Sequence, residues 1–196
     1  MIFYNTEEKE FNELLLNSIK NKEVLHIKKF SKSFLSWTDF INIVDYHYNN
    51  TEGVDTPDKV KNKISGKPTK VSKYSEFHYH ILELTSTHGS SVKLESFFPK
   101  IKLFMNYVRQ SFELMGTLKA IINITGNEYD GDSHQDIYHV CSIQHIGKVE
   151  YRIFSNQKDF TTYVLEPGDL MFMPAGTTHS IFAPEPRATL IMDFHP

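Results

Sequence analysis

The residues in this sequence best suited to chemistry are His134, Asp136 and His179. Side chains two apart in a β-strand point to the same side, so His134-Gln135-Asp136 delivers an imidazole and a carboxylate to one centre. His179 can supply a second imidazole. Two histidines and one carboxylate on one face of an octahedron leave the opposite positions open, as in non-haem Fe(II) enzymes. These three residues therefore predict a site for one divalent metal ion.

A His-x-Asp tripeptide is weak evidence by itself, because such tripeptides occur by chance. The segment GDLMFMPAGTTH, residues 168–179, makes the pattern specific. It predicts a strand, a tight Pro/Gly turn and then a histidine at the start of the next strand. The metal prediction depends on this combination of the two segments.

Short β-rich runs dominate the chain after Gly116 and are separated by Gly, Pro and Asp/Asn clusters. Strands spaced this tightly indicate a sandwich or a barrel. The expected strands are residues 118–125, 138–144, 149–154, 161–165, 169–173, 179–183 and 189–194.

The first half of the chain has a helical character. Apolar residues recur at helical spacing from Phe11 to Ile19, and Ser36-x-x-Asp39 predicts a capping box at the start of a second helix. A third helix is expected over residues 99–116, and the polar stretch 49–75 is expected to be a long loop or lid. We expect residues 1–117 to pack on a core formed by residues 118–196, so that the two parts make one domain.

Two segments carry a resemblance to a known family. Residues 168–179 resemble the second motif of the cupins, and HQDIYHVCSIQHIGKVEYRIF, residues 134–154, resembles the JmjC-type branch of that fold. This branch includes the asparaginyl hydroxylase of hypoxia-inducible factor and the ribosomal oxygenases. The further residues that match its pattern are Gln144, Gly147, Tyr151 and Phe154. The resemblance implies a mainly β chain with a double-stranded β-helix (jelly roll, cupin-like) core and N-terminal helices packed outside it.

The same resemblance implies an Fe(II)- and 2-oxoglutarate-dependent oxygenase, with O2 as the other co-substrate. The keto-acid end of 2-oxoglutarate would chelate the iron, and its oxidation to succinate would accompany hydroxylation of the substrate. In such enzymes the metal carries the difficult chemistry and the protein orients the reactants.

The far carboxylate of 2-oxoglutarate needs a cation, because an unpaired carboxylate in a closed pocket is costly. In JmjC-type relatives a Lys or Arg two residues after the glycine turn usually supplies it, and Val149 stands there instead. Arg187 resembles in its placement the arginine of the prolyl-hydroxylase branch, with Thr189 as a same-face partner, and a guanidinium can grip a carboxylate bidentately. Two alternatives are an Arg187 that faces solvent, and Lys148 after a one-residue shift in register. Arg152 would need the same shift as Lys148, and its other interpretation is an outward-facing residue.

Other polar residues on the expected strands have less specific interpretations. Asn123 and Asp193 are candidates for the surroundings of the metal and its co-substrate, and the alternative for both is ordinary strand polarity. His139 and His145 lie at odd offsets from His134. We expect them on the opposite face of the strand, as surface or partly buried residues.

The composition excludes several classes of partner. A net charge of −3 and a pI near 6.4 give no basic surface for nucleic acid. No apolar run approaches the roughly 20 residues that cross a bilayer. The single cysteine cannot form an internal disulfide, and the N-terminus MIFYNTEEKEF lacks a signal-peptide pattern. We expect a cytoplasmic protein, whose oligomeric state stays open.

Three functions remain in competition at this point. The first is a 2-oxoglutarate-dependent hydroxylase acting on a protein side chain or a small molecule, with residues 49–75 as the substrate-selecting loop. The second, which Val149 favours, is a metal-binding cupin with chemistry that does not use 2-oxoglutarate. The third is a non-catalytic cupin that binds a ligand.

Overall fold

The computed structural model describes residues 8–32, 35–39, 42, 60–62, 90–95, 119–125, 129–156 and 158–194. The elements within these ranges are, in chain order, α1 (Glu8–Asn21), β1 (Leu25–Ile27), β2 (Val60–Asn62), β3 (Ser90–Glu95), β4 (Lys119–Thr125), β5 (Tyr129–Asp130), β6 (His134–Gln135), β7 (His139–Ile146), β8 (Val149–Phe154), β9 (Phe160–Leu165), β10 (Leu170–Met173), β11 (Thr178–Ala183) and β12 (Arg187–Phe194).

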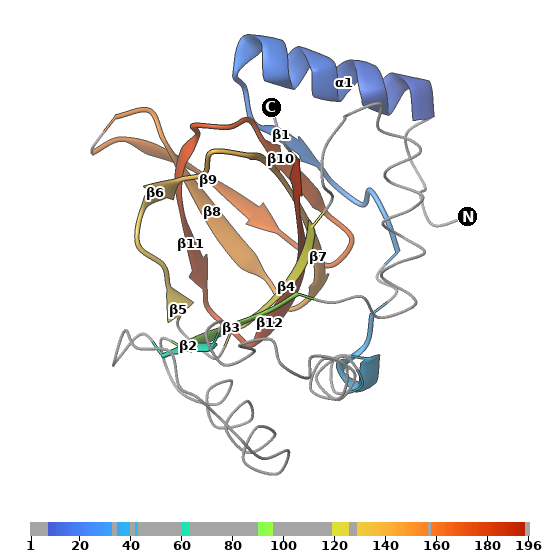
Figure 1. Cartoon of the computed structure of the whole chain (residues 1–196), viewed down its shortest axis with the longest axis vertical. Helices are drawn as coiled ribbons and strands as arrows, with labels where there is room; N and C mark the ends of the chain where they lie inside the picture. Colours follow the sequence, from blue (N-terminus) through green and yellow to red (C-terminus); the bar gives the residue numbers. More distant parts are fainter. Residues whose placement is uncertain are drawn as a thin grey trace.

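The strands form two antiparallel sheets that curve around a shared interior (Figure 1). The larger sheet has the order β1-β10-β7-β12-β4-β3-β2, and the smaller has the order β5-β11-β8-β9 with β6 also paired to β11. From β7 onward the chain crosses repeatedly between them, because β7, β10 and β12 belong to the larger sheet and β8, β9 and β11 to the smaller. This topology is a double-stranded β-helix, and it confirms the predicted fold class.

Apolar side chains from both sheets meet in the interior. Because side chains alternate along a strand, each strand contributes every second residue to this core. The central cluster comes from β7 and β10 on one side and β8 and β9 on the other, and consists of Val140, Val149, Tyr151, Leu165, Met171 and Met173.

The opposite face of the larger sheet is buried as well, which explains why β7 and β12 are buried along almost their whole length. Ile143 and Leu190 on this face are fully buried. Helix α1 lies beside β1 and β10 (Figure 1) and buries Phe11 and Leu15. The Phe11 ring lies 4.7 Å from that of Phe30, measured between centroids. The first predicted helix is therefore present and packs outside the barrel.

The predicted capping box at Ser36 is present. The Asp39 backbone N–H donates to Ser36 Oγ over 3.2 Å, and the Ser36 N–H donates to Asp39 Oδ2 over 2.9 Å. The continuation of this helix and the helix expected over residues 99–116 lie outside the described residues.

Five short strands fall outside the seven expected ranges, namely β1, β2, β3, β5 and β6. β2 falls inside the stretch 49–75 that was expected to be a loop, so that prediction is wrong for Val60–Asn62. β2 pairs with β3, and β3 pairs with β4, so both strands extend the larger sheet through backbone hydrogen bonds. Such pairing at a sheet edge leaves little periodicity in the sequence. The rest of 49–75 lies outside the described residues, and the division at residue 117 stays a prediction.

Candidate metal centre

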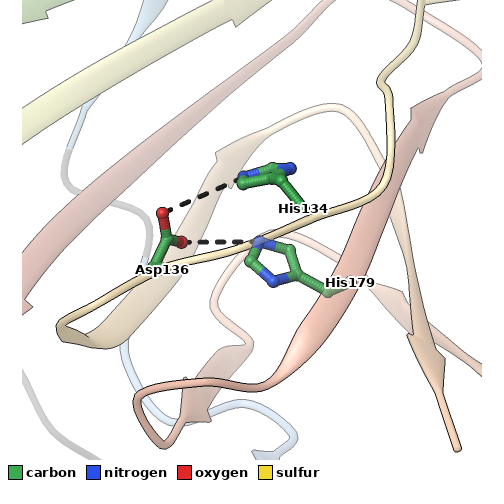
Figure 2. Close-up of side chains that lie close together, drawn as sticks. All are labelled: His134, Asp136 and His179. Atoms are coloured by element: carbon green, nitrogen blue, oxygen red, sulfur yellow. Dashed lines mark ion pairs between the residues drawn. The ribbon is translucent and has the colours of Figure 1, made fainter.

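Three side chains with metal-ligating atoms lie together beside β6 and β11 (Figure 2). Asp136 Oδ2 is 3.6 Å from His179 Nε2, and Asp136 Oδ1 is 4.0 Å from His134 Nε2. The two imidazole rings are 4.5 Å apart between centroids. One ligand atom from each residue lies within 4.8 Å of the other two. The structure therefore brings together the three residues that the sequence singled out.

Strand pairing sets the positions of the two histidines. His134 in β6 is the registered partner of His179 in β11, so their side chains lie on the same face of the sheet. The next pair is Gln135 with Thr178, and Gln135 Nε2 donates to Thr178 Oγ1 over 2.7 Å. This contact links the two strands that carry the ligands.

The carboxylate is placed by the turn before β11. The Gly176 N–H donates to the Asp136 backbone carbonyl over 2.8 Å, and Thr177 Oγ1 donates to the Pro174 carbonyl over 2.6 Å. Gly176 has φ of +81°, a conformation that favours glycine. The Pro/Gly turn recognised in the sequence thus fixes the residue that follows β6 as well as the start of β11.

Both histidines are oriented through their Nδ1 atoms. His134 Nδ1 lies 3.0 Å from the Asp132 carbonyl oxygen, and His179 Nδ1 lies 3.0 Å from the Thr177 carbonyl oxygen. A carbonyl only accepts, so Nδ1 carries the proton and Nε2 of the neutral imidazole keeps its lone pair. These Nε2 atoms are the ones that face Asp136. Metal-binding histidines are commonly held by such a bond from the other ring nitrogen.

The cluster is open on one side and supported on the other. The side chains of His134 and Asp136 are 48% and 38% exposed, while that of His179 is 6% exposed. Two imidazole nitrogens and a carboxylate oxygen suit a divalent first-row ion, and solvent access leaves room for further ligands. The donor set therefore fits a metal ion with exchangeable positions.

Arg187, the candidate for the far carboxylate, is fully buried at the start of β12. It is therefore not the solvent-facing residue of the alternative interpretation. Its Nη1 donates to Thr189 Oγ1, and Thr189 Oγ1 donates to Gln144 Oε1 over 2.6 Å. The strand begins two residues earlier than the sequence indicated, which brings Arg187 into the sheet.

Tyr151 connects this region with the metal centre, and sequence reasoning assigned it no role. Its ring centroid is 6.4 Å from that of His179, and it is the registered partner of Ile181 in β11. Burial raises the pKa of the Tyr151 hydroxyl, and the positive charge of Arg187 partly opposes that rise. In the sequence it only matched the JmjC-type pattern, and its position two residues after Val149, on the same face of β8, is the signal that could have predicted its inward orientation.

The other two basic candidates lie elsewhere. Lys148 is exposed, its Nζ is 2.9 Å from Glu166 Oε1, and the pKa of its amine is raised by this partner. Arg152 Nη1 donates to Asp130 Oδ1 over 3.1 Å. Neither joins the buried network, because each lies one residue out of phase with the inward-facing positions of β8. Val149 at the inward position is fully buried in the apolar core.

Asn123 and Asp193, the two remaining candidates, lie on the neighbouring strands β4 and β12. Asn123 in β4 is the registered partner of Thr189 in β12, while its side chain lies outside the described part of the chain. Asp193 is half-buried in β12, four residues after Thr189 and on the same face, and is paired in register with Val140.

The exposure expected for His139 and His145 is wrong. Both are on the opposite face of β7 as predicted, yet they are only 6% and 2% exposed. His139 Nδ1 accepts a hydrogen bond from the Ala175 N–H, and its ring stacks on Phe172. Burial lowers the pKa of His139, and it lowers that of His145 to about 3. Sequence alternation gave the face, but burial of that face depends on distant segments packing over it.

Comparison with known proteins supports the fold. No family model and no curated protein matches the sequence. A solved structure of Escherichia coli YcfD is similar over 100% of this chain and 54% of that chain, with 14% identity and a TM-score of 0.70.

Two further structures describe YcfD as a ribosomal oxygenase from Escherichia coli. The complex with cobalt and 2-oxoglutarate has 15% identity and a TM-score of 0.68, and the complex with cobalt and succinic acid has 15% identity and a TM-score of 0.64. In both, the match covers 100% of this chain and 53% of that chain. The chain thus spans about half the length of YcfD, and the JmjC-type, cupin-like resemblance holds at the level of the fold.

The structure also bears on membrane association. Among the described residues, no helix has both the length and the apolar character to cross a bilayer.

Proposed function

We propose that this chain is an Fe(II)- and 2-oxoglutarate-dependent oxygenase that hydroxylates its substrate. The observation that carries the proposal is the presence, within one barrel, of an accessible His-Asp-His cluster and a fully buried arginine. The first fits a facial metal site with open positions. The second fits the far carboxylate of a dicarboxylic acid.

The roles of the residues follow from their geometry. His134 and His179 would contribute the Nε2 lone pairs that face Asp136, whose carboxylate would offset the charge of the ion. Arg187 would bind the far carboxylate of 2-oxoglutarate in a region without solvent. Tyr151, buried and close to His179, would keep water from the path between these two positions.

Ferrous iron, when bound, supplies the redox chemistry that lets O2 oxidise both 2-oxoglutarate and the substrate. The balanced reaction consumes one 2-oxoglutarate, one O2 and one C–H bond. It yields succinate, CO2 and an alcohol, with one oxygen atom in succinate and one in the alcohol. The similarity to YcfD, solved with cobalt and either 2-oxoglutarate or succinic acid, supports this choice of co-substrate.

The substrate belongs on the open side of the cluster, next to the half-exposed His134. A protein side chain and a small molecule are both compatible with this access. We propose a cytoplasmic location and no nucleic acid or membrane partner.

A second candidate function is a metal-binding cupin whose chemistry does not involve 2-oxoglutarate. The observation that favours it is Val149, an apolar and fully buried residue at the position where JmjC-type relatives usually carry a cation. In this case Arg187 would be a structural residue, and a non-catalytic ligand-binding cupin would also be compatible.

The test is production of succinate from 2-oxoglutarate by protein loaded with Fe(II) under air, which many such enzymes show at a low level without their substrate. We expect succinate from the wild type and none from His179→Ala. Asp132→Asn is the matched control, because only the backbone carbonyl of Asp132 contacts the site. Failure of metal-loaded wild type to bind or turn over 2-oxoglutarate would overturn the proposal and leave the second candidate.

A further inference from the structure

Two hydrogen bonds fix the orientation of the side-chain amide of Gln144 in β7. Its Nε2 donates to the Ile146 carbonyl over 2.6 Å and to the Gly147 carbonyl over 2.9 Å. Carbonyl oxygens cannot donate, so a flipped amide would lose both bonds. The turn between β7 and β8 therefore directs Gln144 Oε1 away from itself and toward β12.

Thr189 links Gln144 to Arg187 by hydrogen bonds of its hydroxyl group. It is the registered partner of Gln144, and its hydroxyl donates to Gln144 Oε1 over 2.6 Å. An amide oxygen only accepts, so the hydroxyl proton is committed to Gln144 and the Thr189 oxygen presents a lone pair. Arg187 Nη1 donates to that oxygen. The hydrogen bonds thus run in one sense, from the guanidinium through the hydroxyl and the amide to the turn.

The backbone keeps the two ends of this chain of bonds together. Gly147 has φ of +66°, and a Cβ at this position would lie 2.3 Å from the Pro186 carbonyl oxygen. The glycine turn therefore touches the residue that precedes Arg187. A register shift between Ala188 and Thr189 marks the same place in the β7–β12 pairing. Movement of the turn would consequently move the start of β12.

We propose that Gln144 is a positioning residue that, through Thr189, orients the Arg187 guanidinium and so makes the site selective for dicarboxylic 2-oxo acids. This inference rests on the proposed function, because it presumes that Arg187 meets the far carboxylate. A bidentate grip requires the planar guanidinium to lie at a defined angle, and a long side chain has many rotamers. Two neutral side chains that fix one Nη set this angle without a competing negative charge.

The experiment measures the dissociation constants of 2-oxoglutarate and of 2-oxopentanoate on protein loaded with Mn(II), a redox-stable stand-in for Fe(II). The second ligand has the same length and the same chelating end, and carries a methyl group in place of the far carboxylate. The ratio of the two constants reports on the Arg187 end alone. A merely structural change in the barrel would weaken both ligands and leave this ratio unchanged.

We expect Gln144→Met and Thr189→Val each to lower the preference for 2-oxoglutarate by about tenfold, the loss of one well-oriented hydrogen bond to a charged group. The double variant should lose little more than either single variant, since both break the same chain of bonds. Thr189→Ser keeps the hydroxyl and should restore the preference. Gln144→Glu should lower it furthest, because its carboxylate cannot donate to the turn and would compete for Arg187.

Gln135 and Thr178 provide a matched control, because they form the same kind of amide-to-hydroxyl contact at the metal end. Gln135→Met should leave the ratio unchanged. If Gln144→Met does not fold, as judged by circular dichroism, the pair Thr189→Val and Thr189→Ser carries the test.

The outcomes separate the two proposals. A wild type that shows no preference for 2-oxoglutarate overturns the proposed function and this inference with it. A wild type whose preference is lost in Arg187→Met but kept in Gln144→Met and Thr189→Val overturns the inference alone. The same holds if those variants weaken both ligands equally.

Discussion

The metal centre and the Arg187 region are two polar sites in one barrel with opposite environments. His134 and Asp136 are 48% and 38% exposed and come from a short strand and the turn after it, whereas Arg187 is fully buried in the eight-residue strand β12. The histidines of the metal centre are oriented by backbone carbonyls of nearby residues. The arginine contacts Thr189, two residues later in β12, and Thr189 is in turn hydrogen-bonded to Gln144 in a distant part of the chain.

This difference agrees with what we propose that each site binds. A metal that exchanges ligands with solvent needs accessible positions, and half-exposed side chains cost little to leave without an ion. A buried guanidinium is costly unless its donors are engaged, so its surroundings have to be built into the strands. We therefore expect changes at the metal centre to affect function without unfolding the protein, and changes around Arg187 to affect both.

The largest effect is expected at the metal centre. Loss of a hydrogen-bond partner of a metal ligand lowers affinity by roughly 10- to 100-fold, so loss of a ligand itself in Asp136→Ala should lower it further. Mn(II) binding followed by isothermal titration calorimetry measures this, and succinate production should fall below detection. Thermal stability without metal should change little, because Asp136 is half-exposed.

Asp130→Asn is the control for this variant, since it removes an exposed carboxylate that pairs with Arg152 outside the site. Equal loss of Mn(II) affinity in both variants would mean that general surface charge, and not the cluster, binds the ion.

Arg187→Met should have the next largest effect. Removing one member of a buried charged pair costs about 2 kcal/mol or more, a factor of about 30 in the dissociation constant of 2-oxoglutarate. Mn(II) affinity should be unchanged, because the metal ligands come from other strands. Titration with 2-oxoglutarate at a fixed Mn(II) concentration measures the dissociation constant of 2-oxoglutarate. Parallel loss of Mn(II) binding would show that the two regions are not separable.

Burial of His145 should make the stability of the protein sensitive to acid. The pKa of His145 is lowered to about 3 by burial, so the folded state stays neutral where the unfolded chain, with a pKa of 6.5, takes up a proton. The unfolded state then binds more protons between these values, and stability falls as the pH drops below 6.5 toward 3. This one residue should cost about 2 kcal/mol of unfolding free energy between pH 7 and pH 5.

His145→Leu should remove most of that loss, which urea denaturation at the two pH values measures. His139, whose pKa is also lowered by burial, adds to the wild-type loss in the same direction. An acid response identical in wild type and variant would contradict the burial of a neutral His145.

Lys148→Met should have the smallest effect. Lys148 pairs with Glu166 at the surface, where solvent screens such pairs and they contribute little to stability. The dissociation constant of 2-oxoglutarate should stay within about twofold of the wild type. A loss of 2-oxoglutarate affinity comparable to that of Arg187→Met would mean that Lys148 binds the far carboxylate. That result would contradict the positions of the two cations.

The metal centre could be predicted from sequence because its information is local. The two-residue spacing of His134 and Asp136 predicts that both side chains lie on the same side of an extended segment. The proline and glycine before His179 predict a turn at that position. The seven strands expected after Gly116 were predicted to within a few residues for the same reason, whereas the two-residue strands β5 and β6 fall outside the expected ranges.

The Arg187 region could not be predicted in the same way, because its burial depends on pairings between distant strands. The sequence indicated a strand starting at Thr189, whereas β12 begins at Arg187, which pairs with Thr125 of β4 and follows the Pro186 carbonyl that Gly147 approaches. The buried state of His145 likewise depends on which segments cover the outer face of the larger sheet. Neither fact leaves a periodic pattern in the chain.

A crystal structure with Mn(II) and N-oxalylglycine, an inert mimic of 2-oxoglutarate, would show whether the two regions bind a metal and its co-substrate together. We expect an anomalous peak bonded to His134 Nε2, His179 Nε2 and one Asp136 carboxylate oxygen, with the far carboxylate of the mimic against the Arg187 guanidinium. A metal peak away from these three side chains, or a mimic whose far carboxylate meets neither Arg187 nor its neighbours, would contradict it.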